Sequence, residues 1–210
     1  MAHVGEIRIR PRARVLDTVE QVVATALYIW LVMRLLPTHA TTADWIALLI
    51  LFSEGIVIVL LLARRPTDMI STDYRDWAIA AGGTFLSLAV TRGGDPLAPA
   101  VGGLFLLAGI ATHLTAKFSL RRSFGLVAAH RGLKVTGLYR FVRHPMYVGY
   151  MMTHVGFLLV APTLWNLGVY LGVWALLIAR IFAEERVLSQ DPEYREFKAR
   201  VRYRLVPGVF

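Results

Sequence analysis

Six apolar segments occupy most of the chain, and they constrain its fold more than any other feature. A helix needs about 20 apolar residues to cross the hydrocarbon core of a bilayer. Segments of about that length recur along the 210 residues, and charged residues make up only 18% of the chain. We therefore expect an all-α polytopic membrane helix bundle with about six membrane-embedded helices, in residues 15–36, 45–63, 77–90, 97–118, 146–160 and 163–182.

The third and the last two segments carry further predictions. The segment 77–90 is shorter than the other early segments and includes glycines. Five spans with one re-entrant segment is therefore the alternative to six spans. Only the Ala161-Pro162 turn separates the last two segments, which predicts a helical hairpin. Beyond this hairpin, Asp191-Pro192 is typical of the start of a helix, and a short amphipathic helix is expected there.

The basic residues predict how the chain is oriented. The formal net charge is +9, and only Arg34 and Arg92 fall at outer helix ends if the N-terminus lies inside. Lys and Arg favour the cytoplasmic side of a membrane, so we expect an integral membrane protein, in the cell inner membrane, with both termini cytoplasmic. The charge then faces membrane lipids rather than nucleic acid. The chain has no cysteine, which excludes disulfides, thiolate catalysis and zinc–thiolate sites, and no metal site is predicted.

Polar side chains gather just before the fifth segment. Arg143 and His144 precede Pro145, which suits the first turn of a helix because it lacks an N–H. The positive end of such a helix attracts anions, and nearby tyrosines add hydroxyl groups. We interpret this stretch as half of a site for a carboxylate or phosphate, formed by Tyr139, Arg143, His144 and Tyr147. The alternative is that the arginines, Arg140 above all, only anchor the span to lipid phosphates.

Two adjacent carboxylates, Glu184 and Glu185, follow the last apolar segment. They lie at the negative end of a helix, so a cation should compensate them: either Arg180 and Arg186 or a bound ligand. Adjacent helical residues point about 100° apart, so only one of the two faces a given pocket. The hairpin brings this pair beside the stretch around His144, and a zwitterionic ligand would satisfy both.

These residues carry a resemblance. Arg143-His144-Pro145-Met146-Tyr147, followed by a hairpin and Glu184-Glu185, is similar to the Arg-His-Pro-x-Tyr … Glu-Glu signature of the integral-membrane methyltransferases. Leu133 to Arg140 and Tyr194 to Gly208 resemble the segments that flank this signature in the family. The superfamily includes isoprenylcysteine carboxyl methyltransferases and phospholipid N-methyltransferases. The resemblance covers residues 119–210, whereas the first four helices match only in being hydrophobic.

The resemblance implies S-adenosylmethionine as the methyl donor, bound in a cytoplasmic pocket. It implies that His144 and Tyr147 contact the cofactor and that Glu184 or Glu185 holds its ammonium group or ribose hydroxyls. With Tyr139 and Arg143 of the anion site, these residues are the predicted cofactor-binding set. The resemblance assigns catalytic roles to Arg204, close to the reacting centre, and to Glu185, which can take a proton where the acceptor is an amine or a thiol. Residues 1–118 are then the N-terminal transmembrane helices, and residues 119–210 are the C-terminal catalytic hairpin with its cytoplasmic loop and tail.

Three ionisable residues fall inside apolar segments: Glu54, His113 and His154. Such residues in a membrane are costly and often line a cavity, so we predict that they contact the substrate. The alternative is that each makes a hydrogen bond between helices and fixes their packing.

The leading hypothesis is an S-adenosylmethionine-dependent methyltransferase that acts on a lipid-like or membrane-embedded acceptor. Carboxyl O-methylation of an isoprenylcysteine-type substrate is the first choice, and phospholipid N-methylation is the alternative within the superfamily. Two other classes stay open: an NADPH-dependent membrane reductase of the sterol type, and a non-enzymatic membrane protein. The sequence indicates neither the methyl acceptor nor the oligomeric state.

Overall fold

The computed structural model describes residues 11–35, 44–91 and 93–210, and most of these residues are helical. Short 3₁₀ turns lie at Leu86–Ala89, Arg121–Ser123 and Gly137–Arg140. No strand occurs in the described part of the chain, so the all-α prediction is confirmed. The α-helices are α1 (Pro11–Leu35), α2 (Asp44–Ala63), α3 (Tyr74–Phe85), α4 (Pro99–Leu120), α5 (Pro145–Val160), α6 (Leu164–Leu188) and α7 (Pro192–Arg200).

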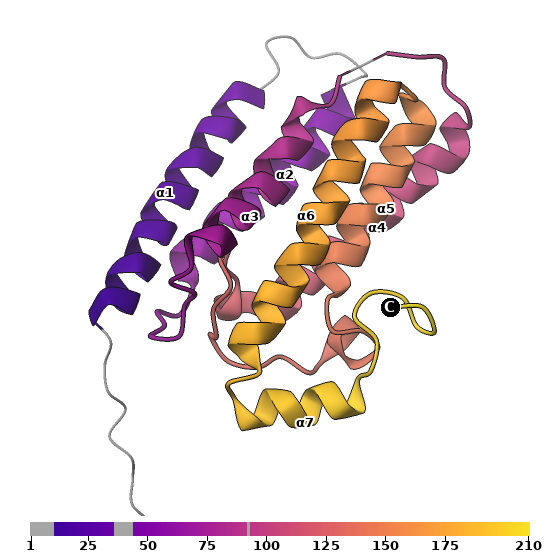
Figure 1. Ribbon diagram of the computed structural model, residues 1–210. Helices are drawn as coiled ribbons and strands as arrows, with labels where there is room; N and C mark the ends of the chain where they lie inside the picture. The colour runs from indigo at the N-terminus through magenta and orange to yellow at the C-terminus, as the bar shows by residue number, and fades with distance from the viewer. Residues whose placement is uncertain (1–10, 36–43, 92) are drawn as a thin grey trace, which may run out of the picture.

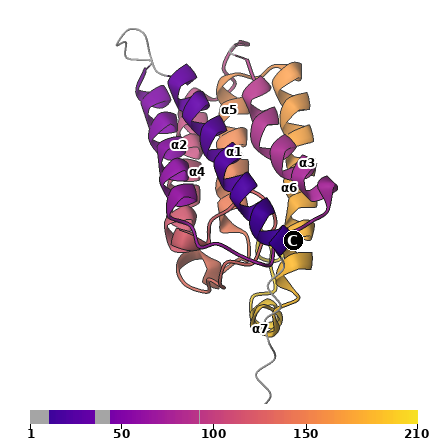
Figure 2. The same ribbon diagram turned by 90° about the vertical axis from the view of Figure 1, so that its left-hand side faces the viewer.

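The first six helices stand side by side, and α7 lies across one end of them (Figure 1). The turned view in Figure 2 shows the same arrangement, with α7 below the ends of the other helices. The predicted hairpin is present, because α5 ends at Val160 and α6 begins at Leu164. The short helix expected after Asp191 is also present as α7, and the Asp191 carboxylate caps it by accepting from the backbone N–H of Glu193 at 2.9 Å.

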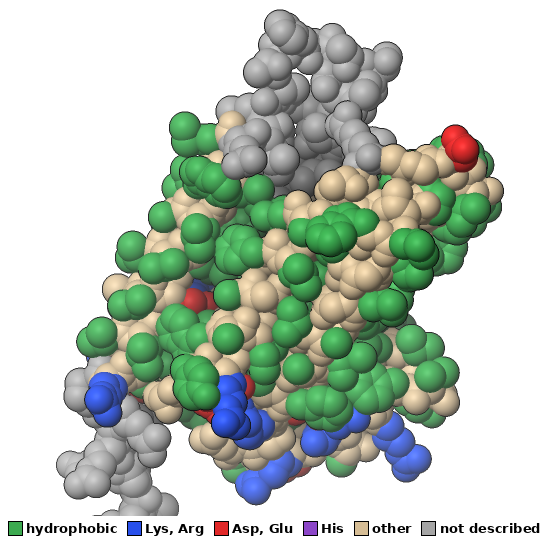
Figure 3. Space-filling model, turned by 45° about the horizontal axis from the view of Figure 1, so that its top comes forward, with side chains coloured by type: hydrophobic (Ala, Val, Ile, Leu, Met, Phe, Trp, Pro, Cys, Tyr) green, Lys and Arg blue, Asp and Glu red, His purple; other side chains and the backbone are tan. Residues whose placement is uncertain are grey.

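The flank of the bundle is apolar, as a membrane protein requires. Figure 3 shows hydrophobic side chains over this flank, with Lys and Arg gathered at its lower edge. Within the described residues, two helices are long and apolar enough to cross a membrane, Pro99–Ser123 and Leu164–Leu188. The helix Pro145–Val160 is apolar but shorter, and the 12 residues of α3 extend only about 18 Å at 1.5 Å per residue. The count of six spans therefore stays a prediction.

Glycines allow α4 and α5 to pack unusually closely, and α5 contacts α4 far more than it contacts α6. A Cβ on Gly109 would lie 2.7 Å from the carbonyl oxygen of Gly149, and one on Gly156 would lie 2.7 Å from that of Gly102. Small residues at such positions let two backbones approach in a membrane helix pair. This contact fixes the start of α5 against the end of α4.

The end of the bundle that carries α7 is here called the polar end, and its two longest connections are joined to each other. The link between α2 and α3 runs beside the loop between α4 and α5. The backbone N–H of Ser71 donates to Ala128 at 2.9 Å, and that of His130 donates to Met69 at 2.8 Å. An isolated antiparallel bridge joins Ile70 to Ala129. The first half of the chain thus supports the loop that precedes the His144 stretch.

Candidate active site

The C-terminal tail returns to the start of α5. The backbone N–H of Arg143 donates to the carbonyl of Tyr203 at 3.0 Å, and that of His144 donates to Arg204 at 2.9 Å. Pro145 is the first residue of α5, as predicted. Proline suits this position because it has no backbone N–H that would need a hydrogen-bond acceptor. The tail therefore places Arg204 beside the cluster formed by the ends of α5 and α6.

Glu185 is surrounded by cations of the protein itself. Its Oε1 accepts from Arg143 Nε at 2.8 Å, and its Oε2 accepts from Arg204 Nη2 at 3.0 Å. Lys198 Nζ lies 3.4 Å from the same Oε2. Arg143 also donates to the carbonyls of Val201 and Arg202, both at 2.8 Å. The carboxylate of Glu185 and the guanidinium of Arg143 are therefore committed to holding the tail against the two helices.

Glu184 has a different environment. It accepts a short hydrogen bond from the Tyr147 hydroxyl and one from Arg180 Nε at 3.2 Å. The ring of His144 lies between the two carboxylates, with Nδ1 at 3.6 Å from Glu184 and Nε2 at 3.4 Å from Glu185. This ring also stacks on Tyr147 at a centroid distance of 5.8 Å. All five side chains thus form one connected cluster at the polar end.

The two glutamates act on the titration of His144 in the same direction. Burial alone lowers the pKa of its imidazole, but hydrogen bonds to Glu184 and Glu185 and their negative charge raise that pKa above its ordinary value. The histidine is therefore held towards its protonated form. The cluster then combines two carboxylates with a positively charged ring.

A cavity at the polar end, here called the polar cavity, opens beside this cluster. Glu184 lines this cavity and Glu185 does not. Of the two adjacent carboxylates, Glu184 is therefore the one that faces this pocket. The Tyr194 hydroxyl is buried without a hydrogen-bond partner among the described residues, and Tyr194 also lines the cavity. Other lining residues include Lys134, Tyr139, Arg143, His144, Tyr147 and Phe197.

Sequence reasoning missed several side chains of this cavity, among them Lys134 and Tyr194. Lys134 and Tyr194 both lie in segments that flank the signature motif, and neither was assigned a role. Lys134 forms no ion pair with the carboxylates of the described residues. The signal was present, because both residues belong to the flanking segments that carry the family resemblance.

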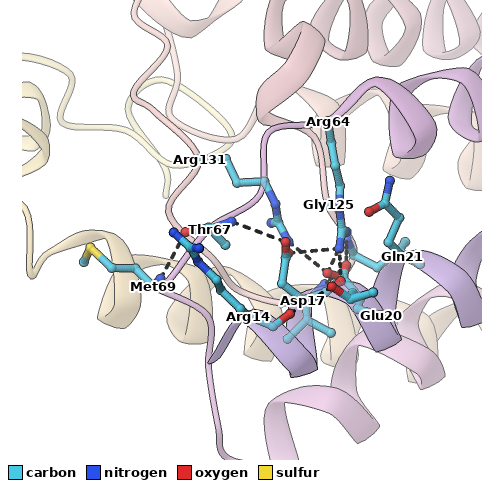
Figure 4. A network of polar contacts seen from close by, with 12 residues as sticks. Arg14, Asp17, Glu20, Gln21, Arg64, Thr67, Met69, Gly125 and Arg131 are labelled. Carbon is cyan, nitrogen blue, oxygen red and sulfur yellow. Dashed lines mark hydrogen bonds and ion pairs between the residues drawn. The ribbon is translucent and has the colours of Figure 1, made fainter. Parts of the chain in front are cut away.

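One wall of the polar cavity is held from the first helix (Figure 4). Asp17 and Glu20 of α1 are buried and both bind Arg131, at 2.6 and 2.9 Å. Glu20 also binds Arg64 at 2.7 Å and accepts from the backbone N–H of Val127 at 3.0 Å. Because Val127 and Arg131 line the polar cavity, the carboxylates of α1 hold the loop that forms its wall.

A second cavity, here called the apolar cavity, lies between the helices above the cluster. Its volume is about 590 Å³, and aliphatic and aromatic side chains from α1, α3, α4, α5 and α6 dominate its lining. His113 and His154 both line it, and their contact with a substrate stays a prediction. Met146 lines both cavities, so they meet at the start of α5. The side chain of Glu54, the third predicted contact, lies outside the described residues.

The alternative assigned to the histidines also has support. His154 Nδ1 accepts from Trp174 Nε1 at 3.1 Å, which is a hydrogen bond between α5 and α6. His113 Nδ1 is buried and has no partner among the described residues. Arg140 stands apart from the cluster, with its guanidinium 5.4 Å from the ring centroid of Phe141, and its interpretation as an anchor stays a prediction.

Comparison with known proteins finds a family match for the helices that build this cluster. Residues 97–191, from the start of α4 to the end of α6, match the family model described as phospholipid methyltransferase. This part of the chain is therefore similar to the phospholipid methyltransferases. The family belongs with the isoprenylcysteine carboxyl methyltransferases to one integral-membrane superfamily, so the resemblance seen in the sequence is confirmed. No curated protein gives a significant match to the chain.

The extent of this match is informative. It includes His144, Tyr147 and both glutamates, and it ends before Arg204 and the rest of the tail. The match supports a membrane methyltransferase that acts on lipid-like substrates. The carboxylates of α1 and the tail lie outside the matched residues.

Proposed function

We propose that the protein transfers a methyl group from S-adenosylmethionine to a lipid-like acceptor at the junction of the two cavities. The observation that carries this proposal is that Met146 lines both a polar cavity with charged groups and an apolar cavity of about 590 Å³. A charged, water-soluble donor suits the first, and an acyl or prenyl chain suits the second. Carboxyl O-methylation of an isoprenylcysteine-type substrate is the first candidate reaction. The match to phospholipid methyltransferases favours phospholipid N-methylation as the second.

The residues around the polar cavity fit the donor. Glu184 offers a carboxylate for an ammonium group, and Lys134 offers an ammonium for a carboxylate. The unpartnered hydroxyl of Tyr194 and the ring of Phe197 suit a sugar hydroxyl and a purine. S-adenosylmethionine supplies an electrophilic methyl group on a sulfonium when bound. Tyr139, His144 and Tyr147 complete the proposed donor site.

The protein then acts by positioning and by excluding water. Arg143, Arg204 and Glu185 close the polar end by tying the tail to α5 and α6. We therefore assign Arg143 and Glu185 to positioning, and Arg204 to the wall between the tail and the reacting centre. A carboxylate acceptor needs no base, whereas an amine must lose a proton, for which Glu184 lies closest to the polar cavity.

The proposed orientation follows the charges. The basic residues gather at the polar end, so we place this end and both termini in the cytoplasm, with the helices in the cell inner membrane. The donor then enters from water and the acceptor from the bilayer. In this arrangement residues 1–118 form the N-terminal transmembrane part and residues 119–210 the catalytic part, although α4 and α5 pack across that division.

Ligand-dependent thermal stabilisation tests the donor. S-adenosylhomocysteine should raise the melting temperature of the purified protein, and NADPH should not. Stabilisation by NADPH alone would support the sterol-type reductase instead, and no response to either ligand would contradict both. Mass spectrometry of lipid extracts after incubation with methyl-labelled S-adenosylmethionine then separates O-methylated from N-methylated products.

A further inference from the structure

Lys117 differs from the other buried cations of the described chain. Its side chain, near the end of α4, is fully buried. The others each have a carboxylate oxygen within 4 Å, whereas Lys117 has none among the described residues. The paired ones are Arg64 and Arg131 with Asp17 and Glu20, Arg143 with Glu185, and Arg180 with Glu184.

Among the described residues, the contacts of Lys117 bring no negative charge to its ammonium group. Its Nζ donates to Ser53 Oγ at 3.3 Å and lies 5.5 Å from the ring centroid of Tyr150. An ammonium carries three donors, and a buried one without an anion is costly in a membrane. An anion brought by a ligand would compensate it.

The surroundings show where such an anion would lie. Ser53, Tyr150 and His113 all line the apolar cavity, so the lysine stands directly behind its wall. Because Ser53 Oγ accepts from the lysine, its own O–H can donate into the cavity. His113 adds a second polar atom, since its buried Nδ1 has no partner among the described residues.

This place is close to the proposed reaction centre. The ring of Tyr150 lies 6.2 Å from that of Tyr147, and the Tyr147 hydroxyl bonds to Glu184. An anion at Ser53 is therefore two aromatic rings away from the cluster that borders the donor cavity. Its chain would extend along the rest of the apolar cavity.

We infer that Lys117, Ser53 and His113 form a subsite for an anionic oxygen group of the acceptor lipid, and thus that the acceptor is an anionic amphiphile. The inference rests on the proposed function, because it takes the apolar cavity as the acceptor site. A carboxylate and a phosphate share this chemistry. The subsite lies outside the residues assigned by the signature motif.

Binding of single-chain amphiphiles tests the subsite. Dodecanoate, dodecyl phosphate and dodecanol are compared at pH 8 in a neutral detergent, with protein fluorescence as the readout. Either anion should bind the wild-type protein at least tenfold more tightly than dodecanol, and the tighter of the two indicates a carboxylate or a phosphate acceptor. Equal binding of all three would overturn the inference.

Substitutions locate the effect. Lys117→Met keeps an unbranched side chain and should abolish the preference for anions, and Ser53→Ala should weaken it. Arg75→Met, at an exposed basic residue of α3, is the matched control and should leave the preference unchanged. Retention of the full preference in both Lys117→Met and Ser53→Ala would refute the subsite. S-adenosylhomocysteine should stabilise both the wild type and Lys117→Met against heat. If it does not stabilise the wild type, the proposed function is refuted instead of the subsite.

Discussion

Exchanging Glu184 or Glu185 for glutamine should show which carboxylate binds the methyl donor and which stabilises the fold. Glu185 and Arg143 have side chains only 5% and 3% exposed, at an N–O distance of 2.8 Å. Breaking a buried ion pair of this kind costs about 3–5 kcal/mol, and the lower end applies because the amide keeps one acceptor oxygen. At about 2–4 °C per kcal/mol for a chain of this size, Glu185→Gln should lower the melting temperature by about 6–12 °C.

Glu184→Gln should instead change stability little and weaken binding of the donor. Its side chain is 20% exposed, and glutamine still accepts from Tyr147 and Arg180. Replacing charge-assisted hydrogen bonds by neutral ones costs about 1 kcal/mol, which is a change of about 2–4 °C. If Glu184 pairs with the ammonium of the donor, losing that pair costs about 2 kcal/mol of binding, or roughly 30-fold in affinity.

The assay is isothermal titration of S-adenosylhomocysteine at a temperature where both variants are folded, with differential scanning fluorimetry for stability. Glu184→Gln should lose about 30-fold in affinity with a small change in melting temperature. Glu185→Gln should lose melting temperature and keep its affinity within about tenfold of the wild type. The reverse order would refute the division of roles between the two carboxylates.

Three further predictions concern the cluster and its support. The raised pKa of His144 means that the stability its protonated ring contributes is fully present below its ordinary pKa near 6.5 and is lost as pH rises through the raised value. The melting temperature should fall over that window in the wild type and not in His144→Gln, and a fall in both would exclude His144 as its origin. Glu20→Gln should weaken S-adenosylhomocysteine binding about tenfold by loosening the cavity wall, whereas Asp68→Asn, at an exposed pair, should leave the dissociation constant unchanged. Gly109→Ala should lower the free energy of thermal unfolding by about 1–3 kcal/mol, because the added Cβ would lie 2.7 Å from backbone atoms of α5. Gly168→Ala, where the Cβ would meet open space, is the control and should not destabilise the protein. Equal effects of the two substitutions would contradict close packing of α4 on α5.

The helices could be predicted from the sequence because their signals are local. Apolar runs set the lengths of the helices, and residues such as Pro145 and Asp191 mark where they begin. The family resemblance rested on the same kind of contiguous motif. These features depend on neighbours in the chain, which the sequence displays directly.

The partners of the charged residues could not be predicted. The sequence did not indicate that Arg143 binds Glu185 and two tail carbonyls. Asp17 and Glu20 lie far along the chain from Arg131, and no spacing rule connects them. The sequence does not reveal the burial of Lys117, because that burial depends on how α2 and α5 pack around it. Such contacts are set by tertiary packing.

The pairing of the tail with the start of α5 has a consequence for biosynthesis. Tyr203 and Arg204 accept the backbone N–H groups of Arg143 and His144, and Arg204 closes the shell around Glu185. The chain is synthesised in order, so helices α1 to α6 are made before these residues of the tail. Its polar end stays unfinished until then. The tail is therefore the part of the chain whose synthesis completes the shell around Glu185.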